Sequence, residues 1–448
     1  MSAGTGTSAP TAHRREILRL AVPAFLALIA EPLFLLADSA IVGHLGTAQL
    51  AGLGVASGAL VTAAGIFVFL AYGTTSVVAR HLGAGDDRAA IGAGIDGLWL
   101  ALGLGAATAV VTALAARPIC AAFGASPAAL EQATTYLRVS ALGLPAMLVI
   151  LAVTGVLRGL QDTTTPLVAS VAGFGANIAL NVVFVYGLHW GIAGSAWGTV
   201  IAQTGMAAGL VAVLLVKARA RQARLRPHPG RVLAAARTGV PLLVRTLALR
   251  ATLLVTTWVA ASLGDVPLAA HQVAMTVWSF LAFALDALAI AAQAITGHAL
   301  GAGDREGVRV TMATMVRWGV WGGLAVGLAV AALHGVIPAL FTNDPAVREA
   351  LGAALVVVGL GQAVAGYVFV LDGVLIGAGD GRWLAWGMVL TFVAYLPVIL
   401  TVRAWGPSGS PVRDVVVLWL AFTAFMVIRG AGLWWRARRD DWMVVGAR

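Results

Sequence analysis

The chain has 448 residues, of which 60% are hydrophobic and only 11% are charged, and its mean hydropathy is +0.91. About a quarter of the residues of a soluble globular protein are charged, because its surface must be wetted, so most of this chain's exterior has to face lipid. This composition excludes a soluble enzyme, a nucleic-acid-binding domain and a disordered scaffold. The net charge of +10 must therefore be interpreted in terms of membrane topology before an anionic partner is inferred.

Long apolar stretches account for most of the chain. A helix that crosses a bilayer needs about 20 mostly apolar residues. Transmembrane β-strands would alternate apolar and polar residues, and these stretches do not, so we expect an all-α polytopic membrane protein. About twelve spans are predicted, at 18–43, 53–79, 91–115, 134–157, 166–187, 193–216, 238–261, 270–296, 314–340, 350–376, 383–402 and 414–435.

The distribution of basic residues predicts the topology. Residues 1–12 are small and polar, Arg14 and Arg15 follow, and the next apolar run is long enough to span the membrane and remain uncleaved. With a cytoplasmic N-terminus, twelve spans place the C-terminus on the same side. The cytoplasmic segments then carry 20 Lys and Arg residues and the external segments carry four. This asymmetry is typical of the positive-inside rule and supports cytoplasmic termini.

The two halves of the sequence match each other at one constant offset, by which Leu82 corresponds to Leu300. We call this difference in residue number the repeat offset. The sequence LGAGD occurs at 82–86 and again at 300–304, and Val22-Pro23 corresponds to Val240-Pro241. Matches along most of the first half share this one offset, which indicates an internal duplication. Each half holds six spans, so the repeats are parallel and related by an axis along the membrane normal, as in secondary transporters whose substrate lies between the halves.

The duplication also predicts the domain organisation. The segment 217–237 contains seven basic residues and no acidic one, and it is the only sizeable linker near the centre of the chain. We expect an N-terminal six-helix lobe over 1–216, a basic cytoplasmic linker over 217–237, a C-terminal six-helix lobe over 238–435 and a cytoplasmic tail over 436–448.

Two carboxylates in the first predicted span are candidate ion-coupling groups. A carboxylate at mid-membrane costs roughly 3 kcal/mol, so it needs a partner, a proton or a function. Glu31 and Asp38 are seven residues apart, which places them on one helix face about 10 Å from each other. Pro32 between them removes a helix hydrogen bond and is expected to bend the helix, and Pro23 offers a second bend nearer the cytoplasm.

The polar residues of span five add to this candidate site. Asn177 and Asn181 lie four residues apart, on one face, and are expected to take part in substrate binding or the coupling network. Interhelical hydrogen bonding is the alternative role for the two amides. The acids and amides are confined to the first half, since their counterparts at the repeat offset are Leu249, Thr256, Tyr395 and Ile399.

The second half carries a different set of charged residues within its spans: Arg245, Arg250, Asp286 and Asp372. Their charges sum to zero, which favours mutual ion pairing, although such pairs also line transport pathways. The histidines in these spans and loops form no cluster with metal-ligand spacing, so no metal site is predicted.

The chain contains none of the common motifs for ATP hydrolysis or hydrolytic catalysis. There is no GxxxxGK[ST], HExxH, CxxC or G-x-S-x-G, so no cofactor is expected and an ion gradient or the substrate's own gradient must supply the energy. A carboxyl group removed from water is able to bind and release protons near neutral pH.

At this point the sequence resembles a known family. Residues 21–56 (AVPAFLALIAEPLFLLADSAIVGHLGTAQLAGLGVA), with LRGLQDTTTP at 157–166, AAHQVA at 269–274 and LGAGD at 300–304, resemble multidrug and toxic compound extrusion (MATE) transporters of the DinF-like bacterial branch. The resemblance covers the whole chain. It implies two six-helix lobes forming a V, alternating access, and export of cationic or amphipathic drugs from a bacterial cell through the inner membrane in exchange for H⁺ or Na⁺.

The family's functional residues can be carried over by motif position. Asp38 resembles the first-helix acidic residue whose protonation is thought to bend that helix and release substrate, and Pro23 resembles the proline at the bend. Asn177 matches the fifth-helix asparagine. Asn181 stands where the branch commonly has aspartate, which weakens any mechanism or Na⁺ site built on two aspartates. Glu31 is a hypothetical source of the second charge.

The resulting prediction is a monomeric H⁺ antiporter for small cationic or amphipathic molecules, with Asp38 as the coupling carboxylate and Na⁺ as the less favoured counter-ion. It has no nucleic-acid partner. Two alternatives are open. One is a flippase for lipid-linked oligosaccharides, which would use basic residues such as Arg245 and Arg250 but commonly has about fourteen spans. The other is an intramembrane enzyme, for which the sequence lacks a cluster of His, Ser or acidic residues near one interface.

Overall fold

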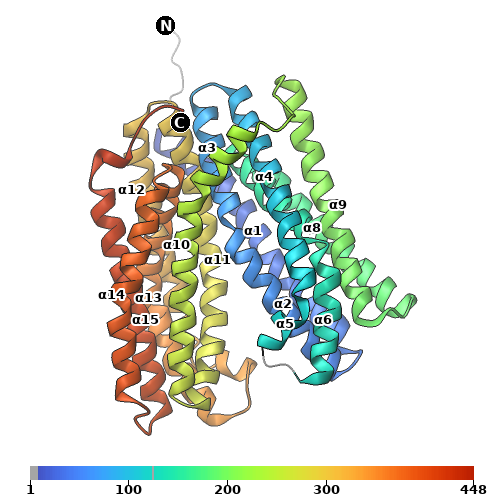
Figure 1. Cartoon of the computed structure of the whole chain (residues 1–448). Helices are drawn as coiled ribbons and strands as arrows, with labels where there is room; N and C mark the ends of the chain where they lie inside the picture. Colours follow the sequence, from blue (N-terminus) through green and yellow to red (C-terminus); the bar gives the residue numbers. More distant parts are fainter. Residues whose placement is uncertain (1–8, 124–125, 448) are drawn as a thin grey trace. The chain divides into compact units, whose positions relative to one another are not determined.

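The computed structural model describes residues 9–123 and 126–447, which are almost entirely helical (Figure 1). The α-helices are α1 (Ala9–Gly43), α2 (Thr47–Phe67), α3 (Phe69–Gly83), α4 (Asp87–Leu114), α5 (Ala116–Ala122), α6 (Pro127–Ala141), α7 (Leu144–Gly159), α8 (Thr164–Val182), α9 (Gly191–Ala220), α10 (Pro229–Ser262), α11 (Asp265–Gly301), α12 (Arg305–Ala332), α13 (Pro345–Gly377), α14 (Gly381–Trp405) and α15 (Pro411–Ala437). Three short elements complete the set: a π-helical turn η1 (Val183–Gly187) and the 3₁₀ turns η2 (Ile337–Leu340) and η3 (Asp440–Trp442).

The helices confirm the prediction of a polytopic all-α protein. Within the described part of the chain, 11 helical segments are long and apolar enough to cross a membrane, α2 with α3 and α8 with η1 each counting as one. The bent pair α6 and α7 raises the number to 12 when it is counted as one span.

Helix boundaries repeat at the predicted offset. Helices α4 (Asp87–Leu114) and α12 (Arg305–Ala332) both contain 28 residues, and their first and last residues are counterparts at the repeat offset. The LGAGD turns before them are also alike. Gly85 and Gly303 have φ values of 78° and 81°, in the left-handed region that favours glycine. Each following aspartate, Asp86 or Asp304, caps the next helix by accepting a backbone N–H at 2.8 or 2.7 Å.

The fourth span differs from the prediction of one continuous stretch over 134–157. Helix α6 ends at Ala141, α7 begins at Leu144, and the two are bent by 53°. Pro145, the second residue of α7, has no backbone N–H, so it cannot continue the hydrogen bonding of α6. The corresponding position of the second repeat is Ala363, and α13 runs through it without a break.

Other boundaries also differ from the sequence prediction. The ninth span was expected to reach residue 340, but α12 ends at Ala332 and a turn follows. Most of the expected linker 217–237 is helical, because α9 continues to Ala220 and α10 starts at Pro229.

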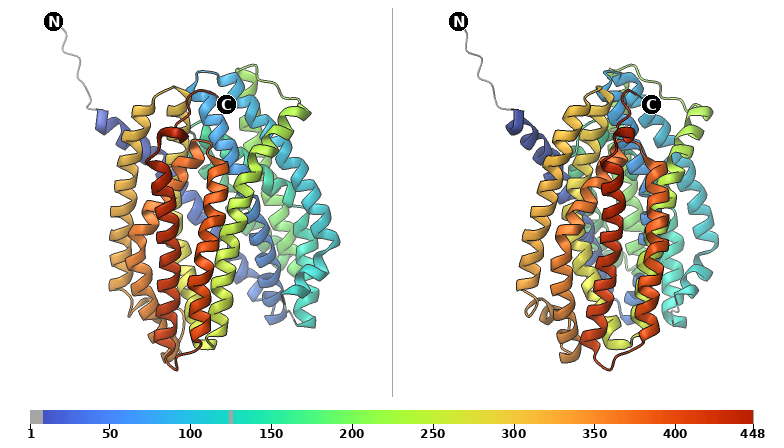
Figure 2. Two further views of the ribbon diagram at one scale, coloured as in Figure 1. Left: turned by 60° about the vertical axis from the view of Figure 1, so that its left-hand side comes forward. Right: turned by 90° about the vertical axis from the view of Figure 1, so that its left-hand side faces the viewer.

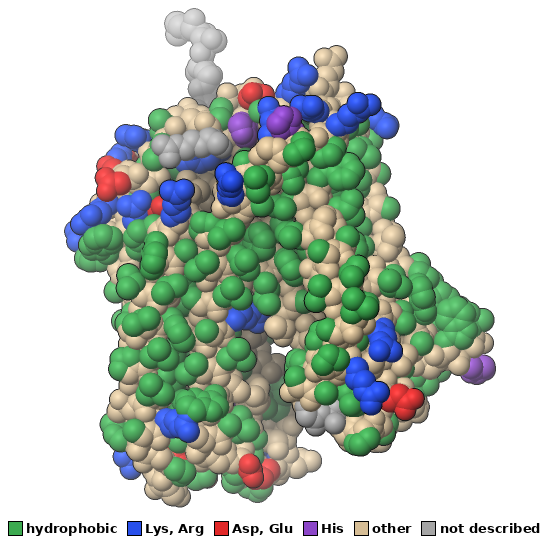
Figure 3. Space-filling view, viewed as in Figure 1, with side chains coloured by type: hydrophobic (Ala, Val, Ile, Leu, Met, Phe, Trp, Pro, Cys, Tyr) green, Lys and Arg blue, Asp and Glu red, His purple; other side chains and the backbone are tan. Residues whose placement is uncertain are grey.

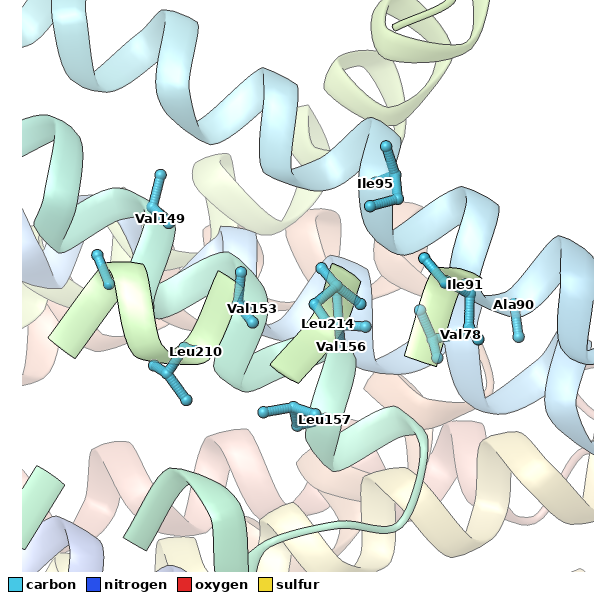
Figure 4. Packing of buried hydrophobic residues seen from close by; sticks show 12 residues of the cluster. Val78, Ala90, Ile91, Ile95, Val149, Val153, Val156, Leu157, Leu210 and Leu214 are labelled. Carbon is cyan, nitrogen blue, oxygen red and sulfur yellow. The ribbon is translucent and has the colours of Figure 1, made fainter. Parts of the chain in front are cut away.

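The chain divides into two compact units, which we call the N unit (Leu18–Val240) and the C unit (Pro241–Val445). In the N unit, buried side chains from α3, α4, α7 and α9 meet in one hydrophobic cluster, in which Val153 and Val156 of α7 lie near Leu214 of α9 (Figure 4). Trp99 of α4 donates to the carbonyl of Leu225 at 3.1 Å, which fastens the chain after α9 to this unit.

In the C unit the long helices run side by side, and α13 packs against α11, α12 and α15 (Figure 2). Helix α12 approaches α13 through Gly319, Gly323 and Gly327, which recur every four residues on its buried face. A Cβ on these glycines would meet backbone carbonyl oxygens of α13. Small residues at this spacing allow helix backbones to approach closely in a membrane, where packing replaces the hydrophobic driving force.

Charged side chains are concentrated at the helix ends. On the face shown in Figure 3, Lys and Arg gather at one end of the helices and hydrophobic side chains cover the middle. In the C unit, Arg309 contacts Asp440 at 2.7 Å and Arg436 contacts Asp380 at 2.6 Å. These pairs tie η3 and the start of α14 to neighbouring helices.

The close packing of the α12 glycines against α13 can be tested with a matched pair of substitutions. Gly323→Ala would place a methyl group against the carbonyl of Gln362, and we expect it to destabilise the protein by about 1–3 kcal/mol. Gly322→Ala meets no atom within 4 Å and should be neutral or stabilising by up to about 1 kcal/mol, because alanine favours helix. Thermal unfolding of the purified protein in detergent measures both. Equal effects of the two substitutions would contradict the close packing.

Candidate functional site

Asp38 lies buried in α1, about 7 Å before the helix ends at Gly43. Its carboxylate accepts hydrogen bonds from three neutral side chains. Ser195 donates at 2.6 Å and Asn181 at 2.8 Å to Oδ1, and Tyr136 donates at 3.2 Å to Oδ2. Donors of this kind stabilise a negative charge that is removed from water without requiring a cationic partner.

A second layer of hydrogen bonds orients these donors. The Asn181 amide nitrogen also donates to Asn177 Oδ1 at 3.0 Å, and the Asn177 amide donates to Thr199 Oγ1 at 3.0 Å. Thr199 in turn donates to the carbonyl of Ser195 at 3.1 Å. All of these side chains are buried, so α1, α6, α8 and α9 are joined by one polar network, which we call the Asp38 network.

Contacts between α1 and α8 lie on either side of this network. Phe34, one turn before Asp38, stacks on Phe174 with ring centroids 5.1 Å apart. On the other side, Tyr186 donates to the carbonyl of Ile41 at 2.7 Å. Tyr186 belongs to the π-helical turn η1, a form of helix that often occurs at functional sites because it redirects the side chains that follow.

The structure brings together three of the residues that the sequence indicated, Asp38, Asn177 and Asn181. Pro23 and Pro32 both lie inside α1, which is assigned as one helix through them. Glu31 belongs to the same helix, but its side chain lies outside the described part of the chain.

Three members of the network were missed by the sequence analysis: Tyr136, Ser195 and Thr199. They are uncharged, so the search for costly charges did not find them. A signal was available in the duplication, because their counterparts at the repeat offset are Ala354, Arg413 and Val417, none of which has a neutral hydroxyl group.

The C unit has a simpler contact at the corresponding place. Thr256 and Tyr395, which occupy the positions of Asp38 and Asn177, are hydrogen-bonded to each other at 2.8 Å. Both are buried. The duplicated helices therefore have a polar contact at this point in both units. Of the two corresponding positions, only the one in the N unit holds a carboxylate.

Two of the charged residues predicted in the second half, Arg245 and Asp372, are paired with each other in the C unit. Arg245 forms a two-point ion pair with Asp372, and Arg429 contacts the same carboxylate at 3.1 Å. Arg429 was not assigned to this group in the sequence analysis. Arg250 and Asp286, the other two predicted members, are half-buried.

Comparison with known proteins places this chain in a family. The MatE profile matches residues 23–183 and again residues 241–401, so its two matches are displaced by the repeat offset at both of their ends. The chain belongs to the MatE family of transporters. The predicted resemblance to MATE proteins is thereby confirmed, and so is the prediction of two six-helix repeats.

Individual relatives agree with this assignment. The chain is 32% identical to DNA damage-inducible protein F of Escherichia coli over 446 residues, covering 96% of this chain and 94% of that protein. It is also 32% identical to Protein DETOXIFICATION 44 of Arabidopsis thaliana, covering 96% and 84%. A crystal structure of a Vibrio cholerae MATE transporter shares the fold, with a TM-score of 0.87 over 97% of this chain and 99% of that one at 20% identity. MATE proteins are membrane transporters rather than enzymes, so this chain is a many-span transporter.

Tyr136 and Tyr186 provide a paired test of the Asp38 network. Tyr136→Phe removes a buried donor to a carboxylate and should destabilise the protein by about 1.5–3 kcal/mol. Tyr186→Phe removes a single hydrogen bond to a backbone carbonyl from a side chain that is 40% exposed, and should cost about 1 kcal/mol or less. Thermal unfolding in the same detergent compares them. If Tyr136→Phe were less destabilising than Tyr186→Phe, the result would contradict a buried hydrogen bond from Tyr136 to Asp38.

Proposed function

We propose that this MATE protein exports organic cations in exchange for H⁺, with Asp38 as the group that binds substrate and proton alternately. The observation that carries the proposal is the chemistry around Asp38, a buried carboxylate whose three hydrogen-bond partners are all neutral. A carboxylate in this setting is stabilised in its charged form, and no ion pair joins it to a basic side chain within the part of the chain that the structure describes. A cationic substrate or a proton supplies the counter-charge.

The exchange follows from the competition between these two ligands. When Asp38 is ionised, a cation near it gains electrostatic attraction that the protein's low-dielectric interior strengthens. When a proton binds, that attraction is cancelled and the cation is released. One pH unit is worth about 1.4 kcal/mol, which biases a two-state carrier about tenfold. Because Asp38 is only 2% exposed, binding requires movement of the surrounding helices.

Asn181 favours H⁺ over Na⁺ in this proposal. The amide uses its nitrogen as a donor to both Asp38 and Asn177, so the network contains one carboxylate rather than two. Hard cations such as Na⁺ are held by several oxygen ligands, often charged, whereas a proton needs a single oxygen. One titratable group then corresponds to one proton per cycle.

The proposal includes a location and a topology. The predicted cytoplasmic segments carry twenty basic residues and the external segments four, which supports cytoplasmic termini. The proposed location is a bacterial inner membrane, where the protein acts as a monomer. The N-terminal lobe over 1–216 then contains the coupling site, the segment 217–237 connects the lobes in the cytoplasm, and the lobe over 238–435 precedes the tail.

Replacing Asp38 tests the coupling role. In proteoliposomes with an imposed pH gradient and a fluorescent organic cation, Asp38→Asn should reduce exchange by at least about tenfold, because the amide cannot be protonated at these pH values. Asp96→Asn, which changes another buried carboxyl of the N unit outside the network, serves as the matched control and should retain exchange.

The same vesicles carrying a Na⁺ gradient without a pH gradient separate the two counter-ions. Wild-type exchange driven by Na⁺ alone would overturn the assignment of H⁺. Exchange that is driven by pH and survives in Asp38→Asn would overturn the role of Asp38 itself.

Asn181→Asp tests the single-proton stoichiometry. The new carboxylate would lie at hydrogen-bond distance from Asp38, and two like charges at this distance cannot both remain ionised in a buried site. We expect the ratio of protons to substrate to rise from one towards two. Measuring substrate accumulation at equilibrium against the size of the pH gradient gives this ratio. An unchanged ratio would show that the second position takes no part in coupling.

A further inference from the structure

Asn181 has one buried atom that the hydrogen bonds of the Asp38 network leave unexplained. Its amide nitrogen donates to Asp38 at 2.8 Å and to Asn177 at 3.0 Å. Its amide oxygen, Oδ1, is buried and accepts no hydrogen bond from the residues that the structure describes. A buried acceptor of this kind costs free energy, so its orientation needs a cause in the packing around it.

The amide oxygen lies against Gly198 of α9. A Cβ built on Gly198 would overlap Asn181 Oδ1, and it would lie 3.1 Å from both Cγ and the backbone nitrogen of Asn181. The oxygen therefore occupies the space that any side chain at position 198 would need. The Cα–H bond that stands in place of a side chain faces this oxygen and is a weak donor, which partly compensates for the missing hydrogen bond.

Gly198 belongs to the face of α9 that supplies the network. Ser195, three residues before it, donates to Asp38. Thr199, the next residue, accepts a hydrogen bond from Asn177. Positions 195, 198 and 199 of a helix lie on one side, and all three residues are buried. The glycine thus allows α9 to lie close to α8 at the level of the carboxylate.

The Asn181 amide has no alternative orientation that would make room for a Cβ at position 198. A half-turn of the amide would direct its oxygen towards Asp38 Oδ1 and Asn177 Oδ1, which are both acceptors. Acceptors that face each other in a buried site repel, so the side chain would have to leave the network instead. Two acceptors on one side and the absent side chain on the other therefore fix the amide together.

The corresponding pair of residues in the C unit has no such arrangement. At the repeat offset, Asn181 corresponds to Ile399 of α14 and Gly198 to Val416 of α15. Both are apolar and branched at Cβ, so there is no amide to orient. The asparagine and the glycine thus differ from their counterparts together, in the unit that holds the carboxylate.

We propose that Gly198 is a positioning residue, which holds the Asn181 amide as a donor to Asp38 and thereby sets how readily this carboxylate binds a proton. Without the amide, Asp38 loses one of its three donors, and hydrogen bonds to a carboxylate favour its charged form. Gly198→Ala should then strengthen proton binding. The contact itself does not depend on transport, whereas its effect on exchange rests on the proposed function of Asp38.

A double-mutant cycle tests the contact between Gly198 and Asn181. Gly198→Ala should lower the Tm of the purified protein. In an Asn181→Ala background it should lower the Tm little or not at all, because the added methyl group then takes the space of the amide oxygen. Residues in contact show this non-additivity, whereas independent sites add. Additive losses of Tm would overturn the proposal.

Infrared spectra of the purified protein over a series of pH values test the positioning role. The band of the protonated Asp38 carboxyl group is identified by its absence in Asp38→Asn. We expect its midpoint to rise by about one pH unit in Gly198→Ala, which is a tenfold gain in proton affinity. Two other glycines of the N unit give matched controls. Gly94→Ala meets the side chain of Val156 at 2.7 Å, outside the network, and Gly205→Ala, on α9 itself, meets nothing within 4 Å.

The controls separate positioning from packing. A midpoint that rises in Gly198→Ala and stays unchanged in Gly94→Ala and Gly205→Ala supports the proposal. A wild-type midpoint in Gly198→Ala, or an equal shift in Gly94→Ala, would overturn it, since the glycine would then serve packing alone. No transport is measured, so a loss of cation exchange in vesicles leaves the result standing. If Asp38 does not titrate in the wild type, the effect on proton binding is overturned along with the proposed exchange.

Discussion

The removal of charge from water is the constraint on which the polar architecture of this transporter depends. A carboxylate inside a bilayer costs roughly 3 kcal/mol unless other groups compensate for it. The N unit compensates for Asp38 with three neutral donors, whereas the C unit compensates for Asp372 with two guanidinium groups. The two solutions have different consequences. Neutral donors stabilise the carboxylate and leave its charge available to a ligand, while ion pairs neutralise it.

Duplication provides the framework in which these two sites differ. Helix boundaries recur at the repeat offset, down to the paired glycine and aspartate of the LGAGD turns. The differences are local. Pro145 breaks the fourth span of the N unit, and Ala363 leaves α13 continuous in the C unit. Tyr136 lies on α6, before this break, so the bend sets the direction from which its hydroxyl group reaches Asp38.

The sequence was sufficient to predict the number of spans and the duplication and to single out Asp38, which the structure places in a buried polar network, because each depends on a strong signal. Long apolar runs, a constant offset and an isolated intramembrane charge are all visible without coordinates. It was not sufficient for Tyr136 and Ser195, since hydroxyl groups are common in membrane helices and only their position in space makes them donors. Arg429 was missed as a partner of Asp372 for the same reason: the pairing joins residues 57 positions apart on different helices.

The distribution of polar residues over the repeats shows how a duplicated fold acquires separate functions. Substitutions in one copy leave backbone packing unchanged as long as helix boundaries and close glycine contacts are kept. Thr256 and Tyr395 illustrate this, since they are hydrogen-bonded directly to each other, whereas their N-unit counterparts Asp38 and Asn177 are joined through Asn181. A neutral contact of this kind holds helices together over a wide range of pH. The two contacts therefore differ in chemistry, a neutral pair in the C unit and a buried carboxylate in the N unit, although they occupy corresponding places in the same fold.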